Sequence, residues 1–369
     1  RLEYTDGTSE EEPAAGLYAM MRINGYLGYS FFFDNEVVLR YEMVLEGYGP
    51  DRILFDGDTI ITCVSNGKLA RLNGLGQVEQ VYDLGEYALH HDIGFGQDGE
   101  ILALAELEGS ENVEDLLISI DMESGEVTQL IDFKEAMSGY YEMTRPISAT
   151  DDFFWQAGEW DWIHLNSLQY MEEDDSLIVS SRETSTIIKL KNIHGDTELT
   201  WLAGDSRFWA DTPYADYCLE QEGDFVPQYG QHCVEYLYDG DEEGVYYLAI
   251  YNNNYWSLNS RDDFDLELAD SVGTDLYGLG DETSQVYVYK IDENNGTFAL
   301  DSSFDVPYSS IVSNGSVYGD SGHWVVNSGV SKVFGEYDAE GNLIREFSYE
   351  CDMQNYRTFK YDFTGFWFE

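Results

Sequence analysis

The chain has 369 residues, of which 43% are hydrophobic and 15% aromatic, enough for one large domain or two ordinary ones. Its net charge of −54 argues against nucleic acid and anionic membrane surfaces as partners. The same charge indicates a strongly solvated surface, as in a secreted or high-salt setting, or else bound divalent cations. No run approaches the length of a membrane-spanning helix, about 18 apolar residues.

Residues 1–15 are polar and acidic and predict a tail or linker. The numbering opens at Arg1 without an apolar leader, so we expect an exported product (secreted, periplasmic or on the cell surface) whose signal peptide was removed. From Gly16 onward, apolar residues alternate and each run ends in Gly, Asn or Asp, a pattern typical of short strands and tight turns. With 35 Gly, 29 Tyr and only 6 Pro, the composition also favours strands over helices.

The predicted strands repeat as a hairpin followed by a third and a fourth strand. The hairpin is found five times, beginning at Ile53, Ile93, Leu168, Val234 and Ser316. Four-stranded units repeated along a chain are typical of a β-propeller. We therefore expect an all-β, six-bladed β-propeller over residues 16–369, with four-stranded blades around a central channel. Its sixth blade would be assembled from the two ends of the chain.

The register of these repeats places polar residues on the channel. Two residues before the first apolar position of four of these strands stand His91, Asn166, His232 and Asn314. Because the first strand of each blade lines the channel, equivalent positions on successive blades converge on its axis. A slip of one residue in a strand would turn its side chain to the other face.

A second pattern groups His164, Asn166 and Arg182. His164 and Asn166 point to the same side of one predicted strand, and the acidic turn 172–176 joins it to the strand 177–181, which ends in Arg182. A His, an amide and an Arg at one end of two paired strands suit an anion that is attacked or transferred. The chain has only 18 Lys and Arg residues, so an Arg beside a His is informative.

Other candidate residues lie outside this group. His90 would face away from its neighbour, and His194 and His323 lie in predicted turns at the surface. Three convergent His residues can also bind zinc or iron, but an Arg is a poor neighbour for a cation, so we expect no metal. No CxxC motif occurs, and Cys218 and Cys233 either close a disulfide or remain thiols.

Together these residues give the chain a resemblance to the bacterial arylsulfate sulfotransferase family, which covers the sequence from Gly16 onward. The matching blocks, in order, are His90–Ile93, Asp161–Ser167, Ser180–Arg182, Trp201–Asp205 and Gln228–His232. Several blocks in the right order are specific where a single block would not be.

The resemblance implies a fold, a reaction and a site. Family members are six-bladed propellers that move a sulfuryl group from a phenolic sulfate donor to a phenol acceptor without a nucleotide, so no cofactor is expected. By this resemblance His232, in the Tyr-Gly-Gln-His motif, attacks sulfur and becomes a transient sulfohistidine in a ping-pong reaction. The family's other sulfate-binding groups fall on His91, His164, Asn166 and Arg182.

The sequence also departs from the family pattern. The β-sandwich that usually precedes the propeller is not visible, which puts dimerisation through it in doubt and leaves the oligomer open, with a homodimer as one candidate. A late hydroxyl-bearing contact to sulfate has Ser310, Ser313 and Asn314 as nearby candidates. Two other functions remain open: a non-catalytic propeller that binds ligands or proteins, and a sulfatase that transfers to water. The Cys/Ser-x-Pro-x-Arg signature of formylglycine sulfatases is absent.

Overall fold

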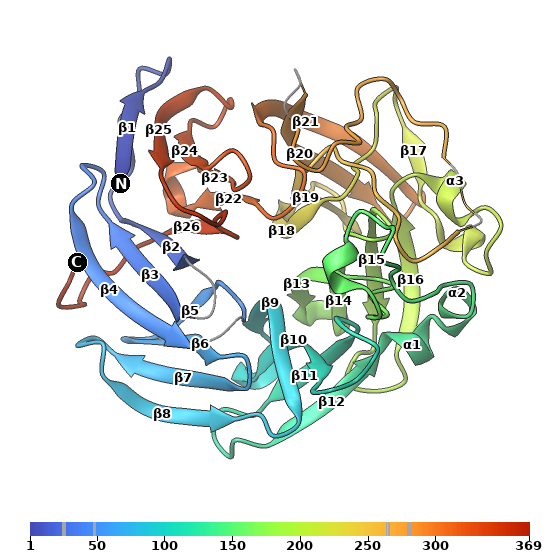
Figure 1. Cartoon of the computed structure of the whole chain (residues 1–369), viewed down its shortest axis with the longest axis horizontal. Helices are drawn as coiled ribbons and strands as arrows, with labels where there is room; N and C mark the ends of the chain where they lie inside the picture. The colour runs from blue at the N-terminus through green and yellow to red at the C-terminus, as the bar shows by residue number, and fades with distance from the viewer. Residues whose placement is uncertain (24–26, 47–48, 263, 265, 279–281) are drawn as a thin grey trace.

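The computed structural model describes residues 1–23, 27–46, 49–262, 264, 266–278 and 282–369. Six β-sheets stand around a common axis as the blades of a propeller (Figure 1), which confirms the predicted fold class. The described part of the chain contains three short α-helices, α1 (Phe133–Ala136), α2 (Ser138–Tyr141) and α3 (Ser206–Trp209). None of its helices is long and apolar enough to cross a membrane.

Each sheet forms one blade, whose strands follow one another from the channel outward. The first blade has β26 (Thr358–Tyr361), β2 (Leu17–Ile23), β3 (Leu27–Phe33) and β4 (Leu39–Glu46). The second has β5 (Ile53–Asp56), β6 (Thr59–Ser65), β7 (Lys68–Asn73) and β8 (Val78–Asp83). The third has β9 (Tyr87–Phe95), β10 (Ile101–Leu107), β11 (Leu116–Ile120) and β12 (Val127–Asp132).

The remaining blades follow the same order. The fourth has β13 (Leu165–Met171), β14 (Ser176–Ser181), β15 (Thr186–Lys191) and β16 (Glu198–Ala203). The fifth has β18 (His232–Asp239), β19 (Val245–Asn252), β20 (Thr283–Asp292), β21 (Thr297–Pro307) and β17 (Glu220–Glu222). The sixth has β22 (Asn314–Tyr318), β23 (His323–Ser328), β24 (Val333–Tyr337), β25 (Leu343–Tyr349) and β1 (Leu2–Asp6).

The two ends of the chain close the ring, as the sequence predicted. In the first blade β26 pairs with β2, with Leu17 opposite Tyr361. Residues 1–15, expected as a tail or linker, contain β1, which pairs along β25 as a fifth strand. Four of its five residues are exposed, so β1 has no buried face and lacks the apolar alternation that marks the inner strands.

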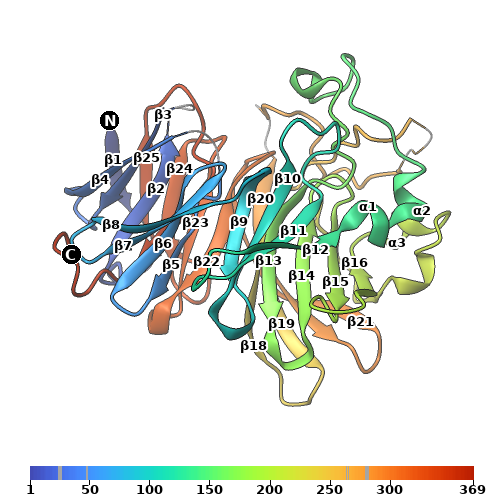
Figure 2. The ribbon, with the colours of Figure 1, turned by 90° about the horizontal axis from the view of Figure 1, so that it is seen from below.

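The hydrophobic cores lie between neighbouring blades. Leu102 and Leu104 of the third blade pack in one cluster with Leu168 and Val179 of the fourth. Strands covered on both faces are buried throughout, as in β14, where residues 177–179 are apolar and the serines at 176, 180 and 181 have their hydroxyls hydrogen-bonded. The long connections after β12 and β19 extend on one side of the propeller (Figure 2), and Tyr255 Oη donates a 3.0 Å hydrogen bond to Asp152 between them.

A layer of charged residues crosses the channel. Arg52 Nε lies 2.8 Å from Asp92 Oδ1, and Arg357 Nη1 lies 3.1 Å from the same atom. Arg52 Nη2 also lies 3.3 Å from Glu235 Oε1, which accepts a 2.9 Å hydrogen bond from Ser316 Oγ. Two guanidinium groups and two carboxylates balance in charge, which a layer with little access to water requires.

Candidate active site

The channel holds a cavity of about 880 Å³ beside this charged layer. Four residues singled out in the sequence line it together: His91, His164, Arg182 and His232. They come from the third, fourth and fifth blades, so the repeat register brought distant parts of the chain to one place.

The rest of the wall combines aromatic and apolar side chains with the acidic Glu106, Glu114 and Glu159 and the amides Gln156 and Gln354. The aromatic members are Phe153, Trp155, Tyr277 and Tyr356. Their rings provide flat apolar surface for an aromatic ligand.

His164 is the cationic histidine of the cavity. Its Nδ1 lies 2.7 Å from Asp161 Oδ2 and also contacts Glu114 Oε2. Burial and the neighbouring Arg182 act to lower its pKa, but Asp161 and Glu114 outweigh them and raise the pKa to about 9. The ring is therefore protonated at neutral pH, and Nδ1 is held by carboxylates while Nε2 remains for a ligand.

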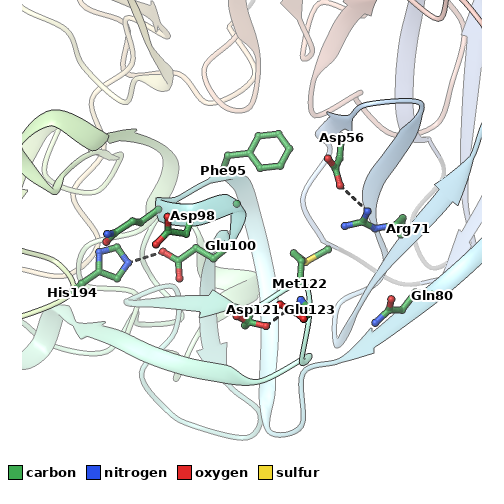
Figure 3. Close-up of a pocket in the computed structure, with 12 residues that line it drawn as sticks. Asp56, Arg71, Gln80, Phe95, Asp98, Glu100, Asp121, Met122, Glu123 and His194 are labelled. Carbon is green, nitrogen blue, oxygen red and sulfur yellow. Dashed lines mark hydrogen bonds and ion pairs between the residues drawn. The ribbon is translucent and has the colours of Figure 1, made fainter.

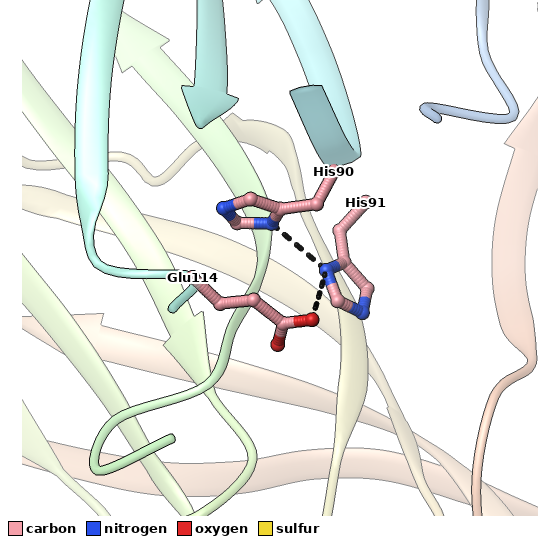
Figure 4. A group of neighbouring side chains, drawn as sticks. All are labelled: His90, His91 and Glu114. Atoms are coloured by element: carbon pink, nitrogen blue, oxygen red, sulfur yellow. Dashed lines mark hydrogen bonds and ion pairs between the residues drawn. The ribbon is translucent and has the colours of Figure 1, made fainter. Parts of the chain in front are cut away.

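His91 is neutral and stands next to His164, with ring centroids 4.8 Å apart. Burial, His164 and His90 hold the pKa of His91 well below its usual value. His91 Nδ1 lies 2.9 Å from His90 Nδ1 and 3.8 Å from Glu114 Oε1 (Figure 4). The prediction that His90 faces away from His91 is wrong, because His91 has a left-handed φ of 52°, which interrupts the strand alternation.

His232 is the second neutral histidine, at the start of β18. Its Nδ1 lies 2.8 Å from Asn253 Oδ1 and 3.0 Å from the carbonyl oxygen of Gly230. Burial holds its pKa well below the usual value, although the bond to Asn253 acts in the opposite direction. With Nδ1 between two acceptors, the lone pair of the neutral ring lies on Nε2. The centroid of the Tyr356 ring lies 6.1 Å from the centroid of the His232 ring.

Arg182 directly follows β14 and is fixed from several sides. Its backbone N–H donates to the carbonyl of His164 at 3.1 Å. Its guanidinium lies over the ring of Phe153, 4.2 Å from the centroid, and Nη2 donates to Asp161 at 3.2 Å and to Glu183 at 3.5 Å. The planar group is therefore held in one orientation at the cavity wall.

Asn166 is buried beside the cavity and does not line it. Its Nδ2 donates a 2.8 Å hydrogen bond to the carbonyl of Gln231, the residue before His232. Its Oδ1 has no hydrogen-bond partner among the described residues. In this conformation the Asn166 amide positions the chain that leads into His232.

The late hydroxyl candidates are also bonded within the protein. Ser310 Oγ donates to the carbonyl of Leu276, and Ser313 Oγ donates to Ser309 Oγ at 2.9 Å. Asn314 exchanges hydrogen bonds with the backbone of Thr358, at the start of β26. At this side of the cavity the lining residues are Ile311 and Val312, with φ of Val312 at 58°.

Sequence reasoning missed several residues that shape the site. Glu114 and Asp161 set the charge of His164, Asn253 holds His232, and Tyr356 lies between the His91 and His232 rings. They stand in connections outside the strand repeat. Only Asp161 had a signal, since it belongs to the block that contains His164.

At the cavity, two overlapping groups of side chains offer atoms for a metal ion: His90, His91 and Glu114, and Glu114, Asp161 and His164. A third group among the described residues, Glu11, Asp338 and Glu340, is outside the cavity lining. Asp161 already accepts from both His164 and Arg182. A divalent cation on the second group would meet the Arg182 guanidinium beside it, so these donors fit a network of ion pairs better than a metal.

A second hollow of about 840 Å³ is lined by residues of the second, third and fourth blades (Figure 3). Its cations are already paired: Arg71 Nη1 lies 2.7 Å from Asp56, and His194 Nε2 lies 2.6 Å from Glu100. Asp98, Asp121 and Glu123 add further negative charge to its lining. This hollow therefore does not suit an anionic ligand.

The structure also bears on the expectations for His194, His323 and two of the cysteines. His194 is exposed as predicted, but His323 is buried, because its ring lies between Glu11 and Glu336 at 2.8 and 2.7 Å. Cys218 and Cys233 are not joined by a disulfide.

The fold and the site define a six-bladed propeller whose channel gathers three His and an Arg at one cavity. The chain belongs to the arylsulfotransferase (ASST) family, whose model matches residues 4–361. The family implies a sulfotransferase that acts on phenolic substrates. No curated protein matches the sequence.

Solved structures similar to this chain include two putative 6-phosphogluconolactonases. The protein from Bacteroides fragilis NCTC 9343 is 14% identical, with 95% of this chain and 86% of that chain covered and a TM-score of 0.45. The protein from Bacteroides uniformis ATCC 8492 is 12% identical, with 96% and 90% covered and a TM-score of 0.47. A functionally unknown protein from Desulfotomaculum acetoxidans DSM 771 is 10% identical, with 94% and 99% covered and a TM-score of 0.46.

Proposed function

We propose that the protein moves a sulfuryl group from a phenolic sulfate ester to a phenolic acceptor by a ping-pong reaction in which His232 is the nucleophile. The observation that carries the proposal is the division of charge in the cavity. His232 is neutral, with its lone pair on Nε2, while His164 and Arg182 supply positive charge on the same wall.

In the first half-reaction, the aryl sulfate places its ring among the aromatic side chains and its sulfuryl oxygens toward Arg182. Nε2 of His232 attacks sulfur, the S–O bond to the phenol breaks, and the electron pair leaves with the phenolic oxygen. His164 donates a proton to this oxygen from Nε2. Arg182 stabilises the charge on the sulfuryl oxygens, which is the main demand of such a transfer.

In the second half-reaction an acceptor phenol occupies the same place. His164, now neutral, takes the phenolic proton, the phenolic oxygen attacks sulfur, and the N–S bond to His232 breaks. The enzyme returns to its starting state, and one site serves both phenols in turn.

Histidines whose pKa values are shifted in opposite directions around one cavity are typical of catalytic sites, which favours an enzyme over a non-catalytic propeller. Transfer to water, as in a sulfatase, differs in the final acceptor alone. The two reactions are separated by measuring turnover of a chromogenic aryl sulfate with and without added phenol. We expect phenol to accelerate release of the chromophore and a sulfated phenol to form.

The kinetic test varies donor and acceptor together. We expect parallel double-reciprocal lines, and intersecting lines would contradict a ping-pong reaction. His232→Gln should transfer at less than about a hundredth of the original rate, because loss of a covalent nucleophile costs several powers of ten. His194→Gln, at an exposed histidine outside the cavity, is the matched control and should keep full activity. Donor-derived sulfate on a peptide with residues 231–233, lost on adding phenol, would identify the intermediate.

A further inference from the structure

The Nδ1 atom of His232 is held by a residue that lies outside every sequence block of the family resemblance. Asn253 directly follows β19 and is completely buried. Its Oδ1 lies 2.8 Å from His232 Nδ1, and the carbonyl of Gly230 lies 3.0 Å from the same nitrogen on the other side. Both partners are neutral oxygens.

The surroundings of Asn253 fix which way its amide points. Its Nδ2 donates to the carbonyl of Ser309 at 2.6 Å and to the carbonyl of Val312 at 2.9 Å. A flipped amide would set its oxygen against those two carbonyl oxygens and lose both bonds. Oδ1 must therefore face His232, and an amide oxygen only accepts. Nδ1 of His232 consequently carries the proton, and Nε2 carries the lone pair.

The backbone of Asn253 is anchored as well. Its carbonyl oxygen accepts a 3.0 Å hydrogen bond from the Ser284 hydroxyl. The oxygen of this hydroxyl, Ser284 Oγ, in turn accepts a 2.9 Å hydrogen bond from the backbone N–H of Ser309. The amide thus spans the turn after β19 and the segment between β21 and β22. This anchoring gives His232 a fixed ring orientation without any direct contact between Asn253 and the cavity.

We propose that Asn253 is a positioning residue that sets the reactive tautomer of His232 and keeps its proton on Nδ1 through the transfer; this inference rests on the proposed function. When Nε2 bonds to sulfur, the ring becomes cationic because Nδ1 keeps its hydrogen. An amide oxygen is too weak a base to remove that proton, whereas a carboxylate accepts one readily. The cationic ring remains a good leaving group, so the N–S bond breaks readily when the second phenol attacks.

The first experiment reads the tautomer without any substrate. Protein labelled with ¹⁵N at histidine is compared for the wild type and Asn253→Ala, with His232→Gln used to assign the signals. We expect the wild type to show one protonated and one unprotonated nitrogen with Nδ1 protonated. In Asn253→Ala the two nitrogen shifts should move toward each other.

Asn314→Ala is the matched control, because Asn314 is equally buried and bonded to backbone but does not touch His232. It should leave the His232 signals unchanged. An unchanged Nδ1-protonated pattern in Asn253→Ala would overturn the proposal, since Gly230 would then suffice alone.

The second experiment measures the kinetic consequence. Removal of a residue that orients a metal-bound histidine typically lowers activity about 10- to 100-fold. We expect an effect of the same size here, with Asn253→Ala lowering kcat by this factor and changing KM for the donor little. A kcat within about a factor of two of wild type would overturn the proposal. If the wild type transferred no sulfate while the tautomer pattern changed as expected, the proposed function would fail and the positioning of His232 would stand.

Discussion

At the scale of single residues, the three cavity histidines differ in charge because of burial and of the groups beside Nδ1. Carboxylates hold His164 cationic, whereas burial keeps His232 neutral, and the amide and carbonyl oxygens at its Nδ1 fix which nitrogen holds the proton. His91 lies against the neutral ring of His90 and is neutral too. The division into acid and nucleophile therefore comes from burial and from neighbours that are partly close in the sequence, such as Asp161 and Gly230, and partly distant, such as Glu114 and Asn253.

The charge of His164 predicts the alkaline limit of the reaction. Its pKa is raised to about 9, so the proton-donating form is present below that pH and disappears above it. We expect kcat/KM for the donor to fall as pH rises through about 9, and measurement of the first half-reaction avoids titration of the acceptor phenol near pH 10. His164→Gln should be slower and lose this limb. A wild-type profile that stayed flat to pH 10 would contradict the assignment.

Substitution of Arg182 by Lys tests whether the planar guanidinium group is needed to bind the sulfuryl oxygens. Arg182→Lys keeps the charge but loses the fork that Phe153 and Asp161 orient. Loss of one charge-assisted bond costs about 1.5–3 kcal/mol, which corresponds to a fall in kcat/KM of roughly 10- to 150-fold. Thermal melting of the variant separates this effect from lost stability, because Arg182 also pairs with buried carboxylates. A kcat/KM of Arg182→Lys within about a factor of two of the wild-type value would contradict the assignment of Arg182 as a sulfate-binding residue.

Substitution of Glu106, an acidic residue of the cavity lining, tests whether negative charge there weakens binding of the donor. Burial, followed by the nearby Glu114, raises its pKa to about 7, so it becomes charged as pH rises above 7 and then repels an aryl sulfate. We expect Glu106→Gln to lower the donor KM by roughly two- to five-fold at pH 8, the scale of one screened charge–charge interaction. At pH 5.5 the difference from wild type should vanish. Glu126→Gln, at an exposed turn, controls for the loss of one charge anywhere on the surface. An equal effect in both variants would exclude a local role.

The sequence found the members of the site that belong to the repeat and missed those that do not. His91 and His232 were found because successive strand starts converge on one axis, and His164 and Arg182 because they stand at one end of the hairpin that carries Asn166. His90 was misplaced because a left-handed residue in the middle of a strand leaves no mark on the polarity pattern. Glu114 and Asn253 were missed because a connection's path over the channel depends on packing that no local pattern encodes.

At the scale of the elements, the ring is closed by backbone pairing and by an aromatic cluster that follows it. Beyond β26 the chain places Phe363, Phe366 and Phe368 in the core beside Phe32 of β3. Phe363 meets the Phe32 ring edge to face, with centroids 5.4 Å apart. The first blade therefore depends on packing between the beginning and the end of the chain.

Phe363→Ala is expected to weaken this closure. Removal of a buried Phe typically costs about 3–5 kcal/mol of unfolding free energy, and Phe363 is only 2% exposed. Trp367→Ala is the control from the same segment, because Trp367 is 59% exposed and should cost less than about 1 kcal/mol. Urea unfolding followed by near-ultraviolet circular dichroism measures both. Equal stabilities of the two variants would show that the aromatic cluster does not hold the ring.

The propeller architecture was predictable because its blades repeat the same hairpin. The closure of the ring was predictable because the sixth four-stranded unit had to be assembled from strands at the two ends of the chain. Strand β1 was not predictable in the same way. It adds to an outer edge through backbone pairing, and Glu3, Tyr4, Thr5 and Asp6 all remain exposed. A strand that buries no face carries no hydrophobic periodicity, so its sequence is indistinguishable from that of a polar tail.

At the scale of the whole molecule, the surplus negative charge lies on the outside, because few of the chain's carboxylates are buried. Arg52, Arg182 and Arg357 are paired with carboxylates around the channel. The formal charge of the chain is −54, so the surface carries far more carboxylates than cations. Mutual repulsion of these groups opposes the compact state.

This surplus predicts that salt stabilises the protein. Screening shortens the reach of surface charges from about 30 Å at 0.01 M to about 10 Å at 0.1 M ionic strength. We therefore expect the melting temperature to rise by on the order of 5 °C between 10 mM and 0.5 M NaCl. Bound divalent cations are the alternative explanation of the acidic surface. Melting temperatures measured over a range of salt concentrations separate charge screening from cation binding. If the salts act by screening, the rise in melting temperature with NaCl and with MgCl₂ should depend on ionic strength alone. If a divalent ion binds, the rise in melting temperature should saturate at or below about 1 mM of that ion and be reversed by EDTA. A melting temperature that plateaus at such concentrations of CaCl₂ or MgCl₂, or that does not respond to NaCl, would contradict the screening account.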